Sequence, residues 1–175
     1  MATFVFLLAS LFFHPSAMAS PFGQGLFGAD VPFGSLTSID MSFSGDVDFT
    51  LTPGGGNFSG QGSHTVTVTS TDVVGYKLYA WASSGTNMSN GTETIPASGN
   101  SSANPLSINT WGYNTTGNTT NYLGMLSTPS LIKDADGPYK NGDDTSVYYG
   151  ANVDITTPAS DYSVPITYTV AAEYQ

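Results

Sequence analysis

The sequence predicts an all-β fold, an antiparallel sandwich of about eight or nine short strands with almost no helix in the mature chain. Residues 162–174 alternate without a break between apolar and polar side chains, which is the period of a strand with one buried face. Turn residues separate further short runs of this kind, and no window carries apolar residues at helical spacing with caps around it. A strand that is apolar on one face needs a second layer, and in an all-β chain that layer is another sheet.

The first half of the chain contains four alternating runs. Those at 39–43 and 47–51 are predicted to form a strand pair or one long bent strand, and the Pro, Gly and Asn residues at 53–57 a loop. Residues 64–70 and 72–81 are predicted as two consecutive strands, the second of them covered on both faces because both of its sides are apolar.

The second half begins with the least periodic part of the chain, residues 83–110. A stretch of this length without regular structure is expected to be functional, mobile or pinned by short irregular strands. Beyond it we predict strands at 110–113, 122–126, 131–132, 147–153 and 162–174, loops at 114–121 and 134–145, and a turn at 158–161.

The N-terminus is typical of a secretory signal. Residues 3–13 are apolar, and Ala17-Met18-Ala19 offers the small residues of a cleavage site, so residues 1–19 are predicted to be removed before Ser20. No Lys or Arg precedes the apolar run, and the alternative is a buried N-terminal segment that is retained. Residues 20–35, rich in Gly, Pro and Phe in an aperiodic pattern, are predicted to form an extended leader, and residues 36–175 the sandwich domain.

Composition excludes several partners. The 175 residues carry 3 Lys+Arg against 13 Asp+Glu, a formal net charge of -10. All three cations are lysines, so no basic patch can neutralise phosphates, and we expect neither nucleic acid nor an anionic membrane surface as a partner. No apolar segment follows the last strand, so no transmembrane anchor is expected there. The chain has no Cys, so its stability must come from the core.

A series of short motifs carries a family resemblance. They follow one another in the order Val66-Thr67-Val68-Thr69, Val74-Gly75-Tyr76-Lys77-Leu78-Tyr79, Asn90-Gly91-Thr92-Glu93-Thr94-Ile95, Thr110-Trp111-Gly112-Tyr113, Gly142-Asp143-Asp144-Thr145-Ser146-Val147-Tyr148-Tyr149-Gly150 and Pro158-Ala159-Ser160-Asp161-Tyr162. This order resembles an immunoglobulin-like surface-protein domain that recurs in exported proteins of candidate-phylum bacteria. The second half is also similar, more distantly, to spore coat protein U and the archaic chaperone-usher pilins, which normally carry cysteines. Both resemblances imply an immunoglobulin-like sandwich displayed on a cell surface without catalysis. The last motif resembles a tyrosine corner, in which the phenol reaches back to a nearby backbone group.

Six Asn-x-Ser/Thr sequons fall in segments predicted to be loops: Asn57, Asn87, Asn90, Asn100, Asn114 and Asn118. In a cell with an oligosaccharyltransferase they would be glycosylated and therefore exposed. The alternative is composition, because a chain rich in Asn, Ser and Thr forms sequons by chance.

An acidic loop offers oxygen ligands of the kind that Ca²⁺ takes. Its candidate ligands are Asp134, Asp136, Asn141, Asp143 and Asp144. The spacing is not that of the twelve-residue helix-loop-helix calcium loop, and the alternative is a simply solvated acidic loop. No other cofactor is expected.

Aromatic side chains supply the one candidate for a ligand surface. Trp111 and Tyr113, beside a polar loop, could stack on sugar rings, whereas Trp81 is predicted to lie in the core. Catalysis is not expected, because the mature chain holds one histidine, His64, without a nucleophile elbow or zinc-ligand spacing.

The function expected from these observations is a secreted structural protein of the cell surface, a subunit of a filament or surface layer. Its partners would be copies of itself or other surface proteins, and residues 20–35 could add as a strand to a neighbour's open sheet edge. The alternative is a glycan-binding or adhesive module that does not polymerise.

Overall fold

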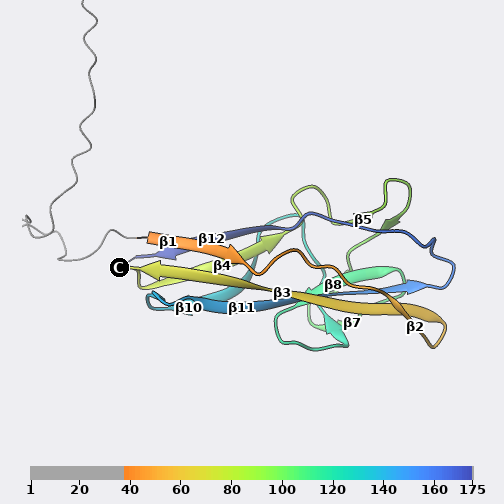
Figure 1. Ribbon diagram of the computed structural model, residues 1–175, viewed down its shortest axis with the longest axis horizontal. Coiled ribbons are helices and arrows are strands. Elements are labelled where there is room, and N and C mark those ends of the chain that lie inside the picture. The colour runs from red at the N-terminus through yellow and green to blue at the C-terminus, as the bar shows by residue number, and fades with distance from the viewer. Residues whose placement is uncertain (1–37, 175) are drawn as a thin grey trace, which may run out of the picture. The chain divides into compact units, whose positions relative to one another are not determined.

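Two antiparallel sheets form a sandwich-like arrangement in the computed structural model, which describes residues 38–174 (Figure 1). The described part of the chain contains twelve strands and no helix, so the predicted all-β class is confirmed. The predicted signal, residues 1–19, and the predicted leader, residues 20–35, lie outside the described residues.

The larger sheet, here called the long sheet, has the order β1-β3-β11-β8, with β2 paired to the start of β3. Its strands are β1 (Ser38–Phe43), β2 (Thr52–Gly54), β3 (Asn57–Thr71), β8 (Thr110–Asn114) and β11 (Asp143–Asp154). The hairpin from β2 to β3 turns at Gly55 and Gly56, whose φ angles of 63° and 97° are those that a type I′ turn requires. The loop predicted at 53–57 is present as the turn at Gly55 and Gly56, but it is shorter than predicted, because Pro53, Gly54 and Asn57 are paired in the hairpin.

The smaller sheet, here called the short sheet, has the order β10-β4-β12. Its strands are β4 (Gly75–Trp81), β10 (Ser130–Asp136) and β12 (Thr167–Glu173). Two further strand pairs stabilise the irregular region between β4 and β10: β5 (Met88–Ser89) with β6 (Thr94–Ile95), and β7 (Asn104–Pro105) with β9 (Asn121–Tyr122). Of the three alternatives predicted for residues 83–110, functional, mobile or pinned by short irregular strands, the structure shows short strand pairs.

The core lies where the two sheets face each other. Val66, Val68 and Val147 of the long sheet meet Tyr76 and Leu78 of the short sheet, and all five side chains are fully buried. Burying such a side chain contributes about 1.5–3 kcal/mol relative to leaving it in water, which compensates for the absence of disulfides.

β4 is covered on one face only, against the prediction. Tyr76, Leu78 and Ala80 point into the core, whereas Tyr79 and Trp81 lie half-buried on the outer face of the short sheet. The prediction that Trp81 is a core residue is therefore wrong. Period-two alternation places Trp81 on the face opposite Ala80, and apolar character alone does not tell which face meets the other sheet.

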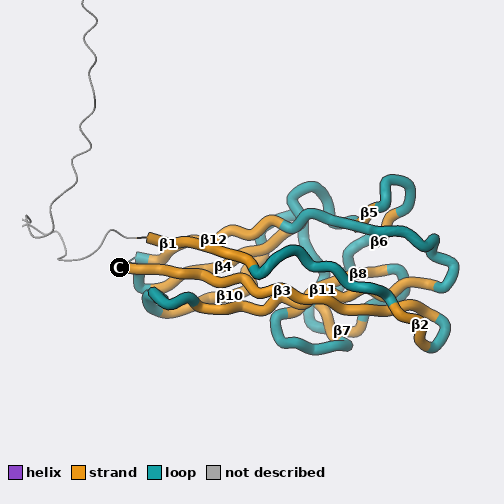
Figure 2. Tube along the Cα trace, in the orientation of Figure 1, coloured by secondary structure: helices purple, strands orange, loops and turns teal. Residues whose placement is uncertain are grey.

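The short sheet covers only part of the long sheet. Figure 1 shows β4, β10 and β12 over one half of β3, while Figure 2 shows loop segments along the other half. Two predictions are corrected here: the strand predicted at 162–174 begins only at Thr167, and the run at 47–51 forms no strand. The alternating residues 47–51 and 162–166 stay extended over the long sheet, but they join no ladder apart from a single bridge at Ser163.

Candidate functional site

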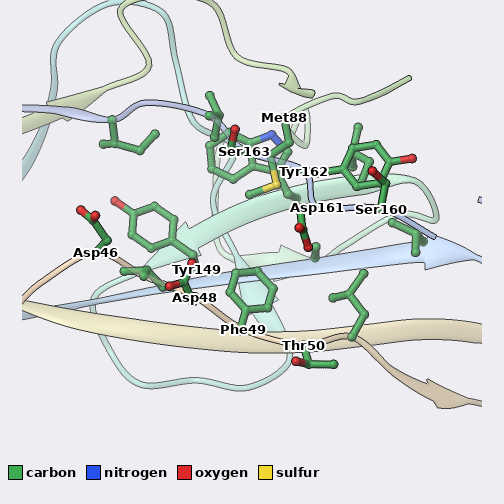
Figure 3. A pocket seen from close by; sticks show the side chains of 18 of the residues that line it. Asp46, Asp48, Phe49, Thr50, Met88, Tyr149, Ser160, Asp161, Tyr162 and Ser163 are labelled. Atoms are coloured by element: carbon green, nitrogen blue, oxygen red, sulfur yellow. The ribbon is translucent and has the colours of Figure 1, made fainter. Parts of the chain in front are cut away.

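An open groove runs along the half of the long sheet that the short sheet leaves uncovered. It has a volume of about 1280 Å³ (Figure 3). Residues 46–51, between β1 and β2, form its first wall, and residues 157–166, before β12, form its second wall. The groove is larger than the roughly 300–1,000 Å³ that small-molecule pockets occupy, and it is elongated along two segments of chain.

The floor of the groove is apolar. It consists of inward-facing side chains of β3, β8 and β11, with Phe58, Trp111, Tyr149, Ala151 and Val153 among them. Met88 and Ile95, from the β5–β6 pair, also line it. No cation is among the lining residues of the described chain. Trp111, Tyr149, Ala151 and Val153 are at most 5% exposed. The accessible apolar surface of the groove is therefore mainly that of partly buried side chains that pack against them, such as Phe58 and Met88.

Both walls present apolar side chains to the groove and polar ones to solvent. Val47, Phe49 and Leu51 are half-buried, and the alternating residues of the first wall are exposed. Val164 and Ile166 do the same on the second wall. The walls thus have the side-chain pattern of strands at the surface of a sandwich.

The walls lack the backbone hydrogen bonds of strands. Residues 46–51 form none with other segments of the described chain. On the second wall, Ser163 exchanges two bonds with Ser89, so its backbone groups point toward β5. Neighbouring residues of an extended chain direct their backbone N–H and C=O groups to opposite edges. The backbone groups of Tyr162 and Val164 therefore face away from β5, and they form no backbone hydrogen bond within the described chain. An unpaired edge of this kind is a template for another strand.

Glycines on β3 let the first wall lie directly on the floor. A Cβ at Gly60 would stand 2.4 Å from the carbonyl oxygen of Thr50, and one at Gly62 would stand 2.9 Å from Cγ1 of Val47. Any larger residue at either position would therefore lift the wall from β3.

An aromatic cluster closes the groove at its β1 end. His64 Nδ1 lies 3.1 Å from the Gly45 carbonyl oxygen, and His64 Nε2 lies 2.7 Å from the Tyr168 hydroxyl. A carbonyl oxygen only accepts, so Nδ1 carries the proton and Nε2 accepts from Tyr168, whose hydroxyl is also hydrogen-bonded to that of Tyr149. Phe43, 49% exposed, stacks at 6.0 Å on the His64 ring. The two nitrogens of His64 thus join the long sheet to the short sheet and to the chain at Gly45, just before the first wall.

We expect this cluster to make the protein sensitive to alkali. Burial raises the pKa of Tyr168 to about 12, and burial followed by the Tyr168 hydroxyl raises the pKa of Tyr149 further. The unfolded phenols titrate near pH 10, so the free energy of unfolding should be unaffected below that pH and should fall as the pH rises from about 10 to 12.

Urea denaturation across pH 7–12 measures this loss. Tyr149→Phe should make the fall above pH 10 shallower, with Tyr174→Phe at an exposed position as the matched control. A fall that is equally steep in wild type and Tyr149→Phe would contradict the assignment.

Three of the five predicted calcium ligands are directed toward other partners. Asp143 accepts hydrogen bonds from Lys133 Nζ and the Tyr76 hydroxyl, each at 2.7 Å. Asp144 accepts from Thr67 at 2.6 Å, and Asp134 lies 3.6 Å from Lys77 Nζ, which also pairs with Glu173. Asp136 and Asn141 are exposed. Within residues 38–174, no group of three or more acidic or histidine side chains gathers as a metal site would require.

The predicted sugar-stacking residues are both buried. Trp111 is 0% exposed, and its Nε1 donates to the carbonyl oxygen of Thr86 at 2.8 Å. Tyr113 is 4% exposed. Stacking on a sugar needs an exposed ring face, which neither residue offers at the surface.

The six sequon asparagines differ in their surroundings. Asn87 and Asn118 are exposed, and Asn90 is half-buried. Asn114 is 3% exposed, with its amide donating to the Asn118 carbonyl oxygen. The side-chain amide of Asn100 donates to three backbone carbonyls, and that of Asn57 donates to Asn152. The amides of Asn100 and Asn114 thus hold loop backbone in place, and that of Asn57 joins β3 to β11.

Sequence reasoning missed the groove, although two signals pointed to it. Alternation at 47–51 and 162–166 predicts strands, while Pro165 removes a backbone donor from the second run. Gly60 and Gly62 carry no side chain on the inner face of β3, so that face shows no apolar pattern upstream of His64. Only the fold shows that another segment lies against these glycines.

Between Ser38 and Tyr174 the structure holds no helix long and apolar enough to cross a membrane. Comparison of the chain with protein-family models, with curated proteins and with solved structures finds no match.

Proposed function

We propose that this chain is a structural subunit of the cell exterior that assembles with copies of itself by strand addition. The observation that carries the proposal is the groove, an apolar floor bounded by two extended walls with unpaired backbone. A strand placed there would gain hydrogen bonds on both sides and would bury its apolar side chains between the walls. The proposal includes an immunoglobulin-like class for the sandwich, the class that the sequence motifs resemble. It is supported by the hydrogen bond of 3.1 Å from the Tyr162 hydroxyl to the Pro158 carbonyl oxygen, the contact that a tyrosine corner makes.

Export is part of the proposal. The predicted signal at residues 1–19 would direct the chain out of the cell, and the leader at residues 20–35 would then be the N-terminus of the mature protein. This leader joins the sandwich through β1, whose first described residue, Ser38, pairs with Thr71 at the end of β3. It is therefore tethered at the opposite end of β3 from the groove, which favours head-to-tail contacts between copies over closed pairs.

Removing the leader tests the function. The chain beginning at Ser20 should form long ordered polymers in negative-stain electron microscopy and elute early in size exclusion, whereas the chain lacking residues 20–35 should stay monomeric. A control of unchanged length replaces residues 20–35 with Gly and Ser and should also stay monomeric. Equal thermal unfolding of the truncated and full chains would show that the sandwich itself is intact.

If the chain that lacks residues 20–35 still forms polymers, the proposal that copies assemble through the leader is contradicted. A full chain that stays monomeric at every concentration would contradict the structural role. The alternative of a glycan-binding module is not favoured by the burial of Trp111 and Tyr113, and a glycan array on the monomeric chain would reveal it.

A further inference from the structure

A second cavity lies on the outer face of the long sheet, on the opposite side from the groove. Phe58 and Val153 pack in the core, so the alternation of a strand places Asn57, Gln61 and Asn152 on the outer face. These three side chains and residues of the β7–β9 region line the cavity. Its volume of about 430 Å³ falls within the range of roughly 300–1,000 Å³ that small-molecule sites occupy.

Two glycines let Tyr122 lie directly on the outer face of the sheet. A Cβ at Gly150 would stand 2.5 Å from the ring of Tyr122, and one at Gly112 would stand 3.1 Å from the Cβ of Tyr122. The Tyr122 hydroxyl donates to the carbonyl oxygen of Thr119 at 3.3 Å. The loop before β9 is therefore held over β11, and the space between this loop and β3 forms the cavity.

Side-chain amides form one side of the cavity. The amide of Asn57 donates to Asn152 Oδ1, and Asn152 Nδ2 donates to the carbonyl oxygen of Leu106 at 3.2 Å. Gln61 Nε2 donates to the carbonyl oxygen of Asn118 at 3.2 Å. Each amide has two donor hydrogens and an oxygen that accepts, and within residues 38–174 the side-chain oxygens of Asn57 and Gln61 form no hydrogen bond. The amides are thus held in place and can still donate to a ligand and accept from it.

The rest of the lining is neutral. Thr119 and Thr120 are exposed and contribute hydroxyl groups, while Pro105 and Leu106 contribute a small apolar surface. Among the residues that the structure describes, no charged side chain lines the cavity. A charged ligand would lose water there without gaining a partner of opposite charge. A neutral ring that carries hydroxyl groups fits, because each hydroxyl both donates and accepts and the C–H groups of the ring suit the apolar surface.

This face has no strand edge to offer to a peptide. Strand addition requires an unpaired edge of a sheet. Along residues 57–59, β3 is paired with β2 on one side and with β11 on the other. Recognition in this cavity must therefore come from side chains, as it does for a small polar ligand.

We infer that the cavity binds a neutral sugar through the amides of Asn57 and Gln61 and the hydroxyl of Thr119. Pro105 and Leu106 contact the C–H groups of the sugar ring. The cavity and the groove lie on opposite faces of the long sheet, so this inference goes beyond the proposed assembly and does not depend on it. A subunit with such a site would attach to carbohydrate outside the cell.

A printed array of neutral and acidic oligosaccharides tests the inference, with the chain beginning at Ser20 as the labelled probe. Binding to at least one neutral oligosaccharide is expected, and calorimetry with that compound gives the Kd. Thr119→Tyr places a phenol ring in the cavity and should abolish measurable binding. The matched control is Thr115→Tyr, the same substitution at an exposed position of the same loop outside the cavity, which should bind as the wild type does.

Gln61→Ala removes one amide and should weaken binding about three- to tenfold, the usual effect of losing one hydrogen bond. Thermal unfolding checks that the variants fold, and Gln61→Ala decides the matter if Thr119→Tyr does not. An array on which no neutral oligosaccharide is bound would overturn the inference. So would a Kd that stays at the wild-type value in the folded variants of Thr119 and Gln61.

Discussion

Trp111→Ala should lower the free energy of unfolding by about 3–5 kcal/mol, the range for removing a large aromatic side chain from a core. The side chain of Trp111 is 0% exposed and packs beside Tyr149, with ring centroids 6.3 Å apart. Its loss would leave a cavity in the floor of the groove.

The same residue holds the irregular region between β4 and β8 in place. Its Nε1 donates to Thr86, its backbone N–H donates to Pro96, and its carbonyl accepts from Ser98. Removing the indole leaves the Thr86 carbonyl without its partner, which adds to the loss.

Urea denaturation followed by circular dichroism measures the effect. The chain contains two tryptophans, so Trp81→Ala, on the outer face of the short sheet, is a matched control with a smaller expected loss. Trp111→Phe should recover part of the stability by refilling the cavity. The account of the core is wrong if Trp111→Ala and Trp81→Ala cost the same.

Gly60→Ala is expected to cost about 1–3 kcal/mol, the usual range for overpacking a tight contact. The new Cβ would stand 2.4 Å from the carbonyl oxygen of Thr50, and this oxygen belongs to backbone rather than to a flexible side chain. The first wall must therefore move away from β3. Because the wall is one of the two edges of the groove, capture of a strand should weaken together with the stability.

Thermal unfolding and the yield of polymers in size exclusion report the two effects separately. Ser59→Ala is the control, because Ser59 lies next to Gly60 on β3 with its side chain exposed, and such a change usually stays within about 0.5 kcal/mol. Equal stability of Gly60→Ala and Ser59→Ala would show that the wall does not rest on this glycine.

Much of the fold could be predicted from alternation alone. β1, β8, β11 and β12 lie within or close to runs in which apolar and polar side chains alternate, because each of these strands has one face toward the interior. The all-β class follows from these strands and from the lack of helical spacing.

Alternation could not predict which segments pair as strands, which tryptophan is buried, or which backbone groups the asparagine amides bind. The walls of the groove alternate as strands do, yet their backbone groups stay unpaired, because the short sheet ends before it reaches them. Trp81 and Trp111 are equally apolar, and only the packing of the sheets puts one outside and the other inside. Likewise Asn100 and Asn114 match sequons, but their amides serve the backbone of their own loops.

The pairing of β1 with β3 also bears on how such a protein would respond to pulling. Six register pairs, from Ser38 with Thr71 to Phe43 with Val66, connect the two strands side by side. Tension that enters through Ser38 acts along the strand direction, so every hydrogen bond of this ladder is sheared at once instead of being peeled open in turn. In a filament of these subunits under tension, the ladder between β1 and β3 should therefore be the last contact to break.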